Sequence, residues 1–468
     1  MPSRVLLINA NRYDWPYPVF PLGLAHLAAH LRQAGHEIRW VDLLAGEPSL
    51  PQVVREFRPQ VTGISLRNID DVLINTQETF FQGLGGMVER LRQMGAGAVV
   101  LGGSGFSIFP RELFDLANAD FGIQGEGEES FSALLEALAG GRDWSNIPGL
   151  VFRQDGVIRL NPPRRLTGPG SSDPANLPPE LVEFYLARSS MLNLQTQRGC
   201  AHRCSYCTYP MIEGSTSRHR PAEEVAADLG HLARRGAPYV FIVDSVFNSS
   251  PERVAAICEE ILRQGVKIKW GCFLRPQGLS TELARLMARA GLAHVEFGSD
   301  SFCDSVLRAF AKGLTFQDIW EASSSLQQAG ADYCHFLICG GPGETDATLR
   351  QTFANSLRLP GGVIMAVVGV RLYPQTPLTR SLVRQGQNLP ARDLLSPKYY
   401  LAPGLTQEGI FSQLQEFSRR HPQWIVGDPP ASYLKMAERL RQRGVIGPLW
   451  SYFAAMQRLI PALRPVPA

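Results

Sequence analysis

Apolar and polar stretches alternate regularly along the first third of the chain. Short apolar runs read "RVLLINAN", "EIRWVDL", "VTGISL", "AVVLGG" and "FGIQG". Between them lie longer stretches with helical character, such as 23–34, 75–93 and 128–139. Strands that alternate with helices favour a parallel, doubly wound sheet. The pattern therefore predicts an α/β domain of the Rossmann or flavodoxin type over residues 1–140.

The loops that follow these strands are rich in glycine and polar residues. They read "NANRYDWPYPVFPLG", "RNIDD", "GGSGFSIFP" and "GEGEES". In a doubly wound sheet, ligands bind outside the carboxyl ends of the strands, where such loops lie. The glycines at 102, 103, 105, 125 and 127 allow close approach of the backbone to a ligand, or they serve only tight turns. No G-x-G-x-x-G motif opens the first helix, so a dinucleotide is not expected.

A second alternation begins after residues 141–186, which we interpret as a linker with a small β-hairpin around "QDGV" and a Pro/Gly-rich stretch. Strands are expected near 191–195, 239–244, 268–274, 294–298, 333–339 and 367–373, with helices between them. Repeats of this kind over 187–377 predict a partial (β/α)6 TIM barrel, with its chemistry at the carboxyl ends of the strands. Residues 378–468 are expected to be a helical C-terminal region.

Composition and charge exclude several classes of protein. Hydrophobic residues make up 44% of the chain and charged residues 19%, which is typical of a globular protein. The net charge of +3 and the absence of a Lys/Arg run give no indication of nucleic-acid binding. No apolar stretch is long enough for a transmembrane segment. The scattered cysteines outside one cluster favour a reducing compartment, so we expect a cytoplasmic protein.

That one cluster is "TQRGCAHRCSYC", which places three of the 8 cysteines within eight positions. Cys200, Cys204 and Cys207 have the spacing C-x3-C-x2-C. A zinc site would need a fourth ligand, and His202 is too close in sequence to complete a tetrahedron with all three thiolates. Three cysteines fit a [4Fe–4S] cluster whose fourth iron stays free for another ligand. Arg198 and Arg203 are expected to favour the thiolate form.

The motif, with Tyr206 before its last cysteine, resembles that of the radical S-adenosylmethionine (SAM) enzymes. The resemblance implies that SAM binds the free iron and that an electron from the cluster cleaves SAM to a 5′-deoxyadenosyl radical. It also implies an external electron donor of the flavodoxin or ferredoxin type. Further stretches with the same resemblance are "VDSVFN", "EFGSDS", "GGPGET" and "VRLYPQTPL", at the ends of expected barrel strands. The SAM-binding residues that it implies are Tyr206, Asp244, Asn248, Glu296, Ser299, Gly340, Gly341 and Arg371, with Asp300 beside them. Taken singly, a residue of this kind is a structural hydrogen-bonding residue at least as often as it is a ligand of SAM.

A glycine-looped α/β domain before such a barrel resembles the cobalamin-binding branch of the same superfamily. "DWPYPVFPLGLAHLAAHLRQAGHEI", "GISLRNIDD", "LGGSGFSIFP" and "IQGEGEESF" carry this resemblance. The D-x-H-x-x-G motif, whose histidine binds cobalt from below in many cobalamin proteins, does not occur here. Arg67 or Asn68 would then face the lower side of the corrin. The cobalamin-binding residues that the resemblance implies are Tyr17, Pro18, Ser65, Arg67, Asn68, Gly102, Gly103, Ser104, Gly125, Glu126 and Gly127.

The resemblance implies a radical SAM enzyme that methylates an unactivated carbon of a small-molecule or lipid-like substrate through methylcobalamin. Within the superfamily, the sequence most resembles the cobalamin-binding radical enzymes associated with lipid biosynthesis. Two alternatives stay open: a non-methylating radical rearrangement, ring formation or oxidation, and a sensor that only binds cobalamin. In the C-terminal region, Trp424, Trp450, Tyr452 and Phe453 either close the barrel mouth over the substrate or belong to an ordinary core.

Overall fold

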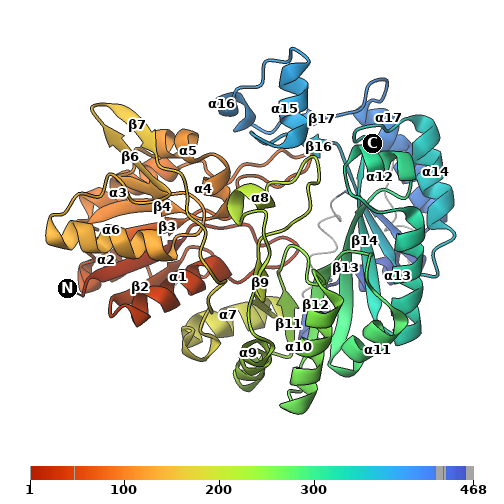
Figure 1. Ribbon diagram of the computed structural model, residues 1–468, viewed down its shortest axis with the longest axis horizontal. Coiled ribbons are helices and arrows are strands. Elements are labelled where there is room, and N and C mark those ends of the chain that lie inside the picture. The colour runs from red at the N-terminus through yellow and green to blue at the C-terminus, as the bar shows by residue number, and fades with distance from the viewer. Residues whose placement is uncertain (1, 47, 428–435, 437–438, 460–468) are drawn as a thin grey trace.

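The computed structural model describes residues 2–46, 48–427, 436 and 439–459. Two α/β bodies lie side by side, the N-terminal one at the left of Figure 1 and the barrel at the right. The elements of the N-terminal body are β1 Arg4–Asn9, α1 Leu22–Gln33, β2 Glu37–Asp42, α2 Leu50–Phe57, β3 Val61–Ser65, α3 Leu84–Gln93, β4 Ala98–Gly102, α4 Ser104–Ile108, α5 Pro110–Ala117, β5 Phe121–Ile123, α6 Glu128–Gly140, β6 Leu150–Gln154 and β7 Val157–Leu160.

The first sheet has seven strands in the order β2-β1-β3-β4-β5-β6-β7. Its first five strands are parallel and have the flavodoxin-like order, so the strand order reverses between β1 and β3. These strands are almost wholly buried because helices cover both faces, and α1 and α6 pack together on one of them. The α/β sheet predicted for the first domain is confirmed.

Two details of the N-terminal body differ from the expectation. The hairpin β6–β7 pairs antiparallel with β5, so it extends the first sheet and is not an isolated part of a linker. The helix expected at 75–93 begins only at Leu84. The residues before it form a loop in which Val72 and Gln77 have positive φ, and its Ile74 is buried in the barrel's apolar core. The positive φ of Gln77 is incompatible with a helix that begins at residue 75.

The connecting segment and the barrel follow. Their elements are η1 Pro174–Asn176, α7 Pro179–Ser189, β8 Leu192–Leu194, β9 Gln197–Arg198, α8 Tyr209–Ile212, β10 Arg218–His219, α9 Ala222–Arg234, β11 Tyr239–Ile242, α10 Pro251–Arg263, β12 Lys269–Leu274, α11 Thr281–Arg289, β13 Leu292–Asp300, α12 Asp304–Ala309, α13 Phe316–Ala329, β14 Asp332–Cys339, α14 Asp346–Ser356, β15 Val363–Val368, β16 Val370–Arg371, α15 Pro377–Arg384, α16 Ala391–Leu394, β17 Tyr399–Tyr400, α17 Gln407–Arg420, β18 Trp424–Val426 and α19 Trp450–Leu459.

The barrel sheet has the order β18-β15-β14-β13-β12-β11-β8, and all of its strands are parallel. The six strands of the expected partial barrel are present, and β18 adds a seventh at its edge. The sixth strand runs over 363–368 rather than 367–373, because the chain bends at Gly369, whose φ is +82°. The C-terminal region is therefore not purely helical: β17 pairs with β16, and β18 completes the sheet.

A buried ion pair joins the two bodies. The Arg371 Nε and Nη2 atoms both lie 2.9 Å from Asp70 Oδ2, across 301 positions of sequence. Arg371 also donates to the carbonyls of Leu372 and Leu394. Both side chains are almost inaccessible to water, so each charge depends on the other for compensation. This pair fixes the loop after β3 on the barrel.

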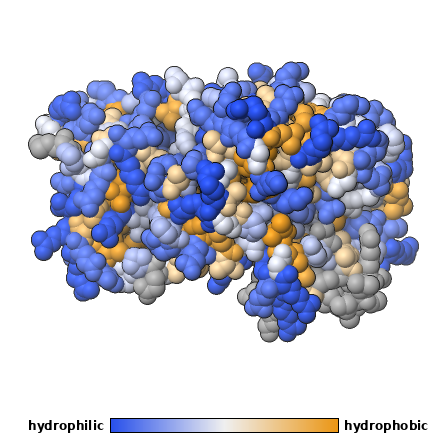
Figure 2. Space-filling model, turned by 90° about the horizontal axis from the view of Figure 1, so that it is seen from below, coloured by the Kyte–Doolittle hydropathy of each residue, from blue (hydrophilic) through white to orange (hydrophobic). Residues whose placement is uncertain are grey.

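No helix in the described ranges is long and apolar enough to cross a membrane. Figure 2 shows one face of the molecule, where hydrophilic side chains predominate and hydrophobic residues appear between them. The largest buried side chains instead lie inside the two bodies, for example Trp270 and Trp424 in the barrel.

Replacing Asp70 by Asn tests the interdomain ion pair. The substitution keeps the size of the side chain but leaves the Arg371 charge buried without its partner. Loss of one partner of a buried pair costs about 3–5 kcal/mol, and we expect a loss of that size in the free energy of unfolding, measured by urea denaturation. The control is Asp14→Asn in the exposed Arg188–Asp14 pair, which should change it by less than about 1 kcal/mol. Equal effects of the two substitutions would contradict the assignment.

Candidate functional site

The cysteine loop lies between β9 and α8, at the carboxyl end of the first barrel strand. Gly199 opens it with a φ of +83°, and a Cβ there would come within 2.1 Å of the Thr216 carbonyl oxygen. The Cys200 amide donates to Gly214 O (3.1 Å), and the Ser205 amide donates to Phe310 O (2.9 Å). These bonds hold the loop against the end of α12. Glycine is therefore required at position 199 to start this turn.

The three cysteines differ from the other five in the chain. Cys200, Cys204 and Cys207 are free and partly exposed, whereas Cys258, Cys272, Cys303, Cys334 and Cys339 are buried. No three Cys, His, Asp or Glu side chains of the described residues are arranged to hold a single metal ion. An iron–sulfur cluster instead presents a separate iron atom to each thiolate. Three accessible thiols on one loop therefore fit the ligand set of a [4Fe–4S] cluster.

Electrostatics around the loop differ in one respect from the expectation. Burial raises the pKa of Cys204 and raises that of Cys207 to about 12, so these two thiols stay protonated at neutral pH. The positive charges of Lys312 and Arg275 oppose this rise at Cys204. Arg198 does not serve the cysteines, because it is paired with Glu128 at 2.7 Å. Lys312 therefore takes the electrostatic role expected of Arg198.

Lys312 belongs to a buried group beside the cysteines. Its Nζ lies 2.9 Å from Asp300 Oδ2, at the end of β13. The hydroxyl of Tyr206 donates to the same carboxylate at 2.8 Å, while its ring packs edge-on against Phe310. The expected Tyr206 and Asp300 thus lie together beside Cys204. Lys312 was missed in the sequence, because nothing in the run "FAKGL" marks this lysine as buried.

The glycine-rich loop after β14 lies against the same part of the barrel. Gly340 has a φ of +89°, and a Cβ at Gly341 would overlap the Phe310 ring. Glu344 accepts the Gly340 amide and is 3% exposed. Burial raises the pKa of Glu344 to about 7. Gly340 and Gly341 therefore hold a tight turn at the carboxyl end of the barrel, as expected, and their contact with SAM stays a prediction.

Other residues predicted to bind SAM are engaged by the protein itself. Asp244 accepts the Thr196 and Gln197 amides and the Thr196 hydroxyl, and burial raises its pKa to about 6. Asn248 bonds the backbone of Arg275 and Gln277. Both order loops at the barrel mouth. Direct contact of these two side chains with SAM stays a prediction.

Two further residues predicted to bind SAM are engaged by other parts of the protein, and their contact with SAM stays a prediction. Ser299 is on the outer side of β13, where its hydroxyl bonds His335 Nδ1 at 2.8 Å beneath α13. Its alternation along the strand turns it away from the barrel lumen. Arg371 uses its guanidinium on Asp70 and on backbone carbonyls, so no donor fork faces the lumen. Sequence position at the end of a strand could not distinguish the two faces.

A cavity of about 440 Å³ lies between the two bodies. It opens at the carboxyl ends of β1, β3, β4 and β5, at the switch in strand order. Barrel residues such as Tyr209, Ile212 and Glu213, just after the cysteine loop, close the other side. Of the residues predicted to bind cobalamin, it is lined by Ser65, Arg67, Asn68, Gly102, Gly103, Ser104, Gly125, Glu126 and Gly127. The two bodies thus share one cavity.

Tyr17 and Pro18 do not line this cavity, and their contact with cobalamin stays a prediction. Tyr17 instead packs with Phe241 and Ile446 inside the barrel, and the Arg441 guanidinium lies 5.9 Å from its ring centroid. Its place in the polar loop after β1 gave no sign that the loop would reach into the barrel. Conversely, Asn9 and Asn11 line the cavity but were not selected. Their position at the carboxyl end of the first strand could have indicated that they line the cavity.

Two polar atoms of the cavity wall indicate a polar ligand. Arg67 Nε and Asn11 Oδ1 are buried and have no hydrogen-bond partner among the described residues. A buried polar atom without a partner costs free energy that a bound group can recover. At Gly102 and Gly127, an added Cβ would meet only ordinary contacts beyond 3.6 Å, so backbone borders open space there. The wall therefore fits a large polar cofactor such as cobalamin.

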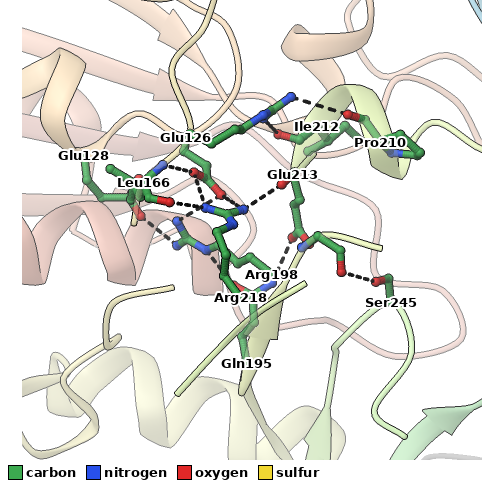
Figure 3. Close-up of polar contacts among 12 residues, drawn as sticks. Glu126, Glu128, Leu166, Gln195, Arg198, Pro210, Ile212, Glu213, Arg218 and Ser245 are labelled. Atoms are coloured by element: carbon green, nitrogen blue, oxygen red, sulfur yellow. Dashed lines mark hydrogen bonds and ion pairs between the residues drawn. The ribbon is translucent and has the colours of Figure 1, made fainter. Parts of the chain in front are cut away.

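A cluster of charged residues, which we call the clasp, joins this wall to the cysteine loop (Figure 3). The Glu126 carboxylate accepts from Arg218 Nη1 at 2.8 Å and Nη2 at 2.5 Å, and from the Leu166 amide. Arg198 donates to Glu128 at 2.7 Å and also to Gln195. Glu126 therefore lines the cavity while its charge is paired with the arginines of the clasp.

The clasp continues into the cysteine loop through backbone groups. Arg218 donates to the Glu213 carbonyl oxygen, and the Glu213 carboxylate accepts the Gly199 amide at 3.1 Å. Arg165, from the segment after β7, donates to carbonyls of α8, including Met211 O at 2.7 Å. The loop that carries the cysteines and the loop that lines the cavity are therefore held by one network.

Comparison with known proteins places these features in families. Residues 194–354 match the radical SAM superfamily, and residues 12–135 match the B12 binding domain. The chain is 27% identical over 455 residues to the tryptophan 2-C-methyltransferase of Streptomyces laurentii, covering 82% of this chain and 75% of that enzyme. It is 26% identical over 325 residues to the hopanoid C-3 methylase of Methylococcus capsulatus, covering 66% of this chain and 59% of that enzyme.

The fold is also that of a solved structure. The radical SAM methyltransferase TsrM of Kitasatospora setae superposes with a TM-score of 0.86 at 23% identity, covering 99% of both chains. The chain therefore carries a radical SAM domain preceded by a B12-binding domain. This confirms the resemblance on which the assignment of the cysteine loop and the interdomain cavity was based.

Replacing Glu126 by Gln tests whether the clasp shapes the cavity. Gln keeps the shape of the side chain but removes the charge that holds Arg218 and Arg198, so the wall should loosen. We expect about tenfold weaker binding of hydroxocobalamin, measured by absorbance titration. The matched control is Glu129→Gln, which removes an exposed partner of Arg164. If both variants bind cobalamin as tightly as the unchanged protein, the clasp has no part in the cavity.

Proposed function

We propose that this protein is a cobalamin-dependent radical SAM C-methyltransferase that acts on a carbon atom of a small molecule. One observation carries the proposal: the two cofactor sites adjoin. Tyr209 and Ile212 line the interdomain cavity, and Tyr209 is only two residues after Cys207. A methyl carrier and a cluster that activates SAM can therefore serve the same substrate.

Each cofactor would meet defined residues. The thiols of Cys200, Cys204 and Cys207 would hold the cluster, with Lys312 close by. The cavity wall from Ser65 to Asn68, together with the glycines after β4 and β5, would hold cobalamin. When bound, the cluster supplies an electron for cleavage of SAM, and cobalamin carries the methyl group that reaches the substrate. The protein positions the reacting groups and excludes water.

The relatives support methylation over the alternatives. The two curated relatives described above are named as a C-methyltransferase and a methylase, one acting on tryptophan and one on a hopanoid. The chain is also 24% identical over 376 residues to an anaerobic magnesium-protoporphyrin IX monomethyl ester cyclase, so ring formation is the second candidate. We further propose an external flavodoxin- or ferredoxin-type donor as the source of electrons. A lipid-like substrate stays a prediction.

Product analysis with methyl-labelled SAM separates methylation from the alternatives. The reconstituted protein is incubated anaerobically with reductant and candidate substrates. Methylation by a radical route predicts label in the product and equal amounts of S-adenosylhomocysteine and 5′-deoxyadenosine. A variant with Ala at all three cysteines is the control and should form neither the labelled product nor 5′-deoxyadenosine. Substrate-dependent 5′-deoxyadenosine without S-adenosylhomocysteine would instead indicate ring formation or rearrangement.

The lower face of cobalamin provides a second test. Arg67 lines the cavity and is half-buried, and the cavity lining in the described residues contains no histidine. We therefore expect no nitrogen ligand from the protein below cobalt. The EPR spectrum of the cob(II)alamin form should lack superhyperfine splitting from an axial nitrogen. Splitting that is lost on substitution of His26 or His30 would contradict this arrangement.

A further inference from the structure

The lumen of the barrel has an apolar wall that is not fully occluded. Four inward-facing residues of neighbouring strands and their ends are only partly buried: Val243, Phe273, Phe336 and Met365. Their alternating neighbours, such as Cys272 and Leu274, pack outward in the main core. Inward side chains that retain exposure border open space. Flat aromatic faces and a methionine sulfur are suited to contact with a planar apolar group.

Gly298 marks the open part of this lumen. It lies within β13, the central strand of the sheet, yet it is exposed to solvent. A Cβ at this position would meet only Lys312 Nζ, at 3.8 Å. Because Lys312 also lies near Asp300 and Cys204, Gly298 is close to the cluster loop. A substrate in this space would lie within reach of both cofactors.

One carboxyl group lies at the floor of the lumen. Glu296 faces inward two residues before Gly298 and is 6% exposed. Its Oε1 atom accepts a hydrogen bond from the Trp450 indole N–H at 3.1 Å. Within the described residues, this is the hydrogen bond that the Glu296 side chain makes. No cation of the described residues forms an ion pair with it. Glu296 lies on the same face of β13 as Gly298, so its carboxyl group is directed toward the lumen.

This carboxyl group differs from those buried acids of the protein that have a cationic partner. Asp70, Glu126, Glu128 and Asp300 each have a cationic partner, as described above. A buried carboxyl that has one donor and no cation retains acceptor capacity. Burial raises the pKa of Glu296 to about 7, consistent with the lack of a charge partner. The Glu296 carboxyl group already accepts a hydrogen bond from an indole N–H, that of Trp450.

We infer that Glu296 is a specificity-determining residue, which accepts a hydrogen bond from an N–H or O–H group on a planar, apolar ring substrate in the lumen. The inference rests on the proposed function for the presence of a substrate there. It replaces the sequence-based assignment of Glu296 to SAM. The apolar wall would contact the faces of the ring, and Oε2 would select its polar edge.

Equilibrium dialysis with two matched probes tests the inference. Indole carries a ring N–H, and 1-methylindole has the same ring without that donor. The full chain, with its cofactors reconstituted anaerobically, should bind indole at least about tenfold more tightly than 1-methylindole. Glu296→Met should abolish this preference, whereas Glu296→Gln should retain part of it through its amide oxygen. Asp332→Asn, an exposed carboxylate on the adjacent strand, is the control and should leave it unchanged.

Retention of hydroxocobalamin by Glu296→Met shows that the variant is folded. Equal binding of the two probes, binding of neither, or an unchanged preference in Glu296→Met would overturn the inference. In the last case Glu296 serves only to anchor Trp450 and α19. S-adenosylhomocysteine formation from SAM and reduced cobalamin needs no substrate, so it reports on the proposed function separately. Its presence without a preference for indole would overturn the role of Glu296 alone.

Discussion

The Glu126 carboxylate is the contact on which the common site depends. It lies on a loop of the N-terminal body and is bound by Arg218, which follows the cysteine loop of the barrel. Both partners are nearly buried, and Leu166 N fills another acceptor position of the carboxylate. Buried charges are costly unless they are paired and hydrogen-bonded. The two bodies therefore have one relative placement in which this charge is compensated.

That placement has a consequence for catalysis. Two α/β bodies each present functional loops at the carboxyl ends of their strands, and the clasp makes those ends face one another across the cavity. The Asp70–Arg371 pair is a second buried link between the bodies, from the loop after β3 to β16. Reactions that use two cofactors need such fixed geometry, because small displacements of reacting groups reduce rates strongly.

Sequence patterns predicted the parts that depend on local chemistry. The period of the strands gave both α/β bodies, and the spacing of Cys200, Cys204 and Cys207 gave the cluster loop. Nine of the residues expected to bind cobalamin line the cavity, because βα loops of a parallel sheet converge at one edge. What a strand end does not specify is which face a side chain takes. The strand-end positions of Ser299 and Arg371 therefore did not predict their bonds to other parts of the protein, and nothing in the loop of Tyr17 predicted that it enters the barrel.

The central claim is that the cluster and cobalamin occupy adjoining parts of one site. Its most direct measurement is the spin relaxation of cob(II)alamin in the presence of the reduced cluster, by pulsed EPR. Because α8 connects Cys207 to the cavity wall, we predict relaxation of the cobalt signal that is clearly faster with the paramagnetic cluster than in the variant lacking the three cysteines. Identical relaxation in the two samples would contradict a common site.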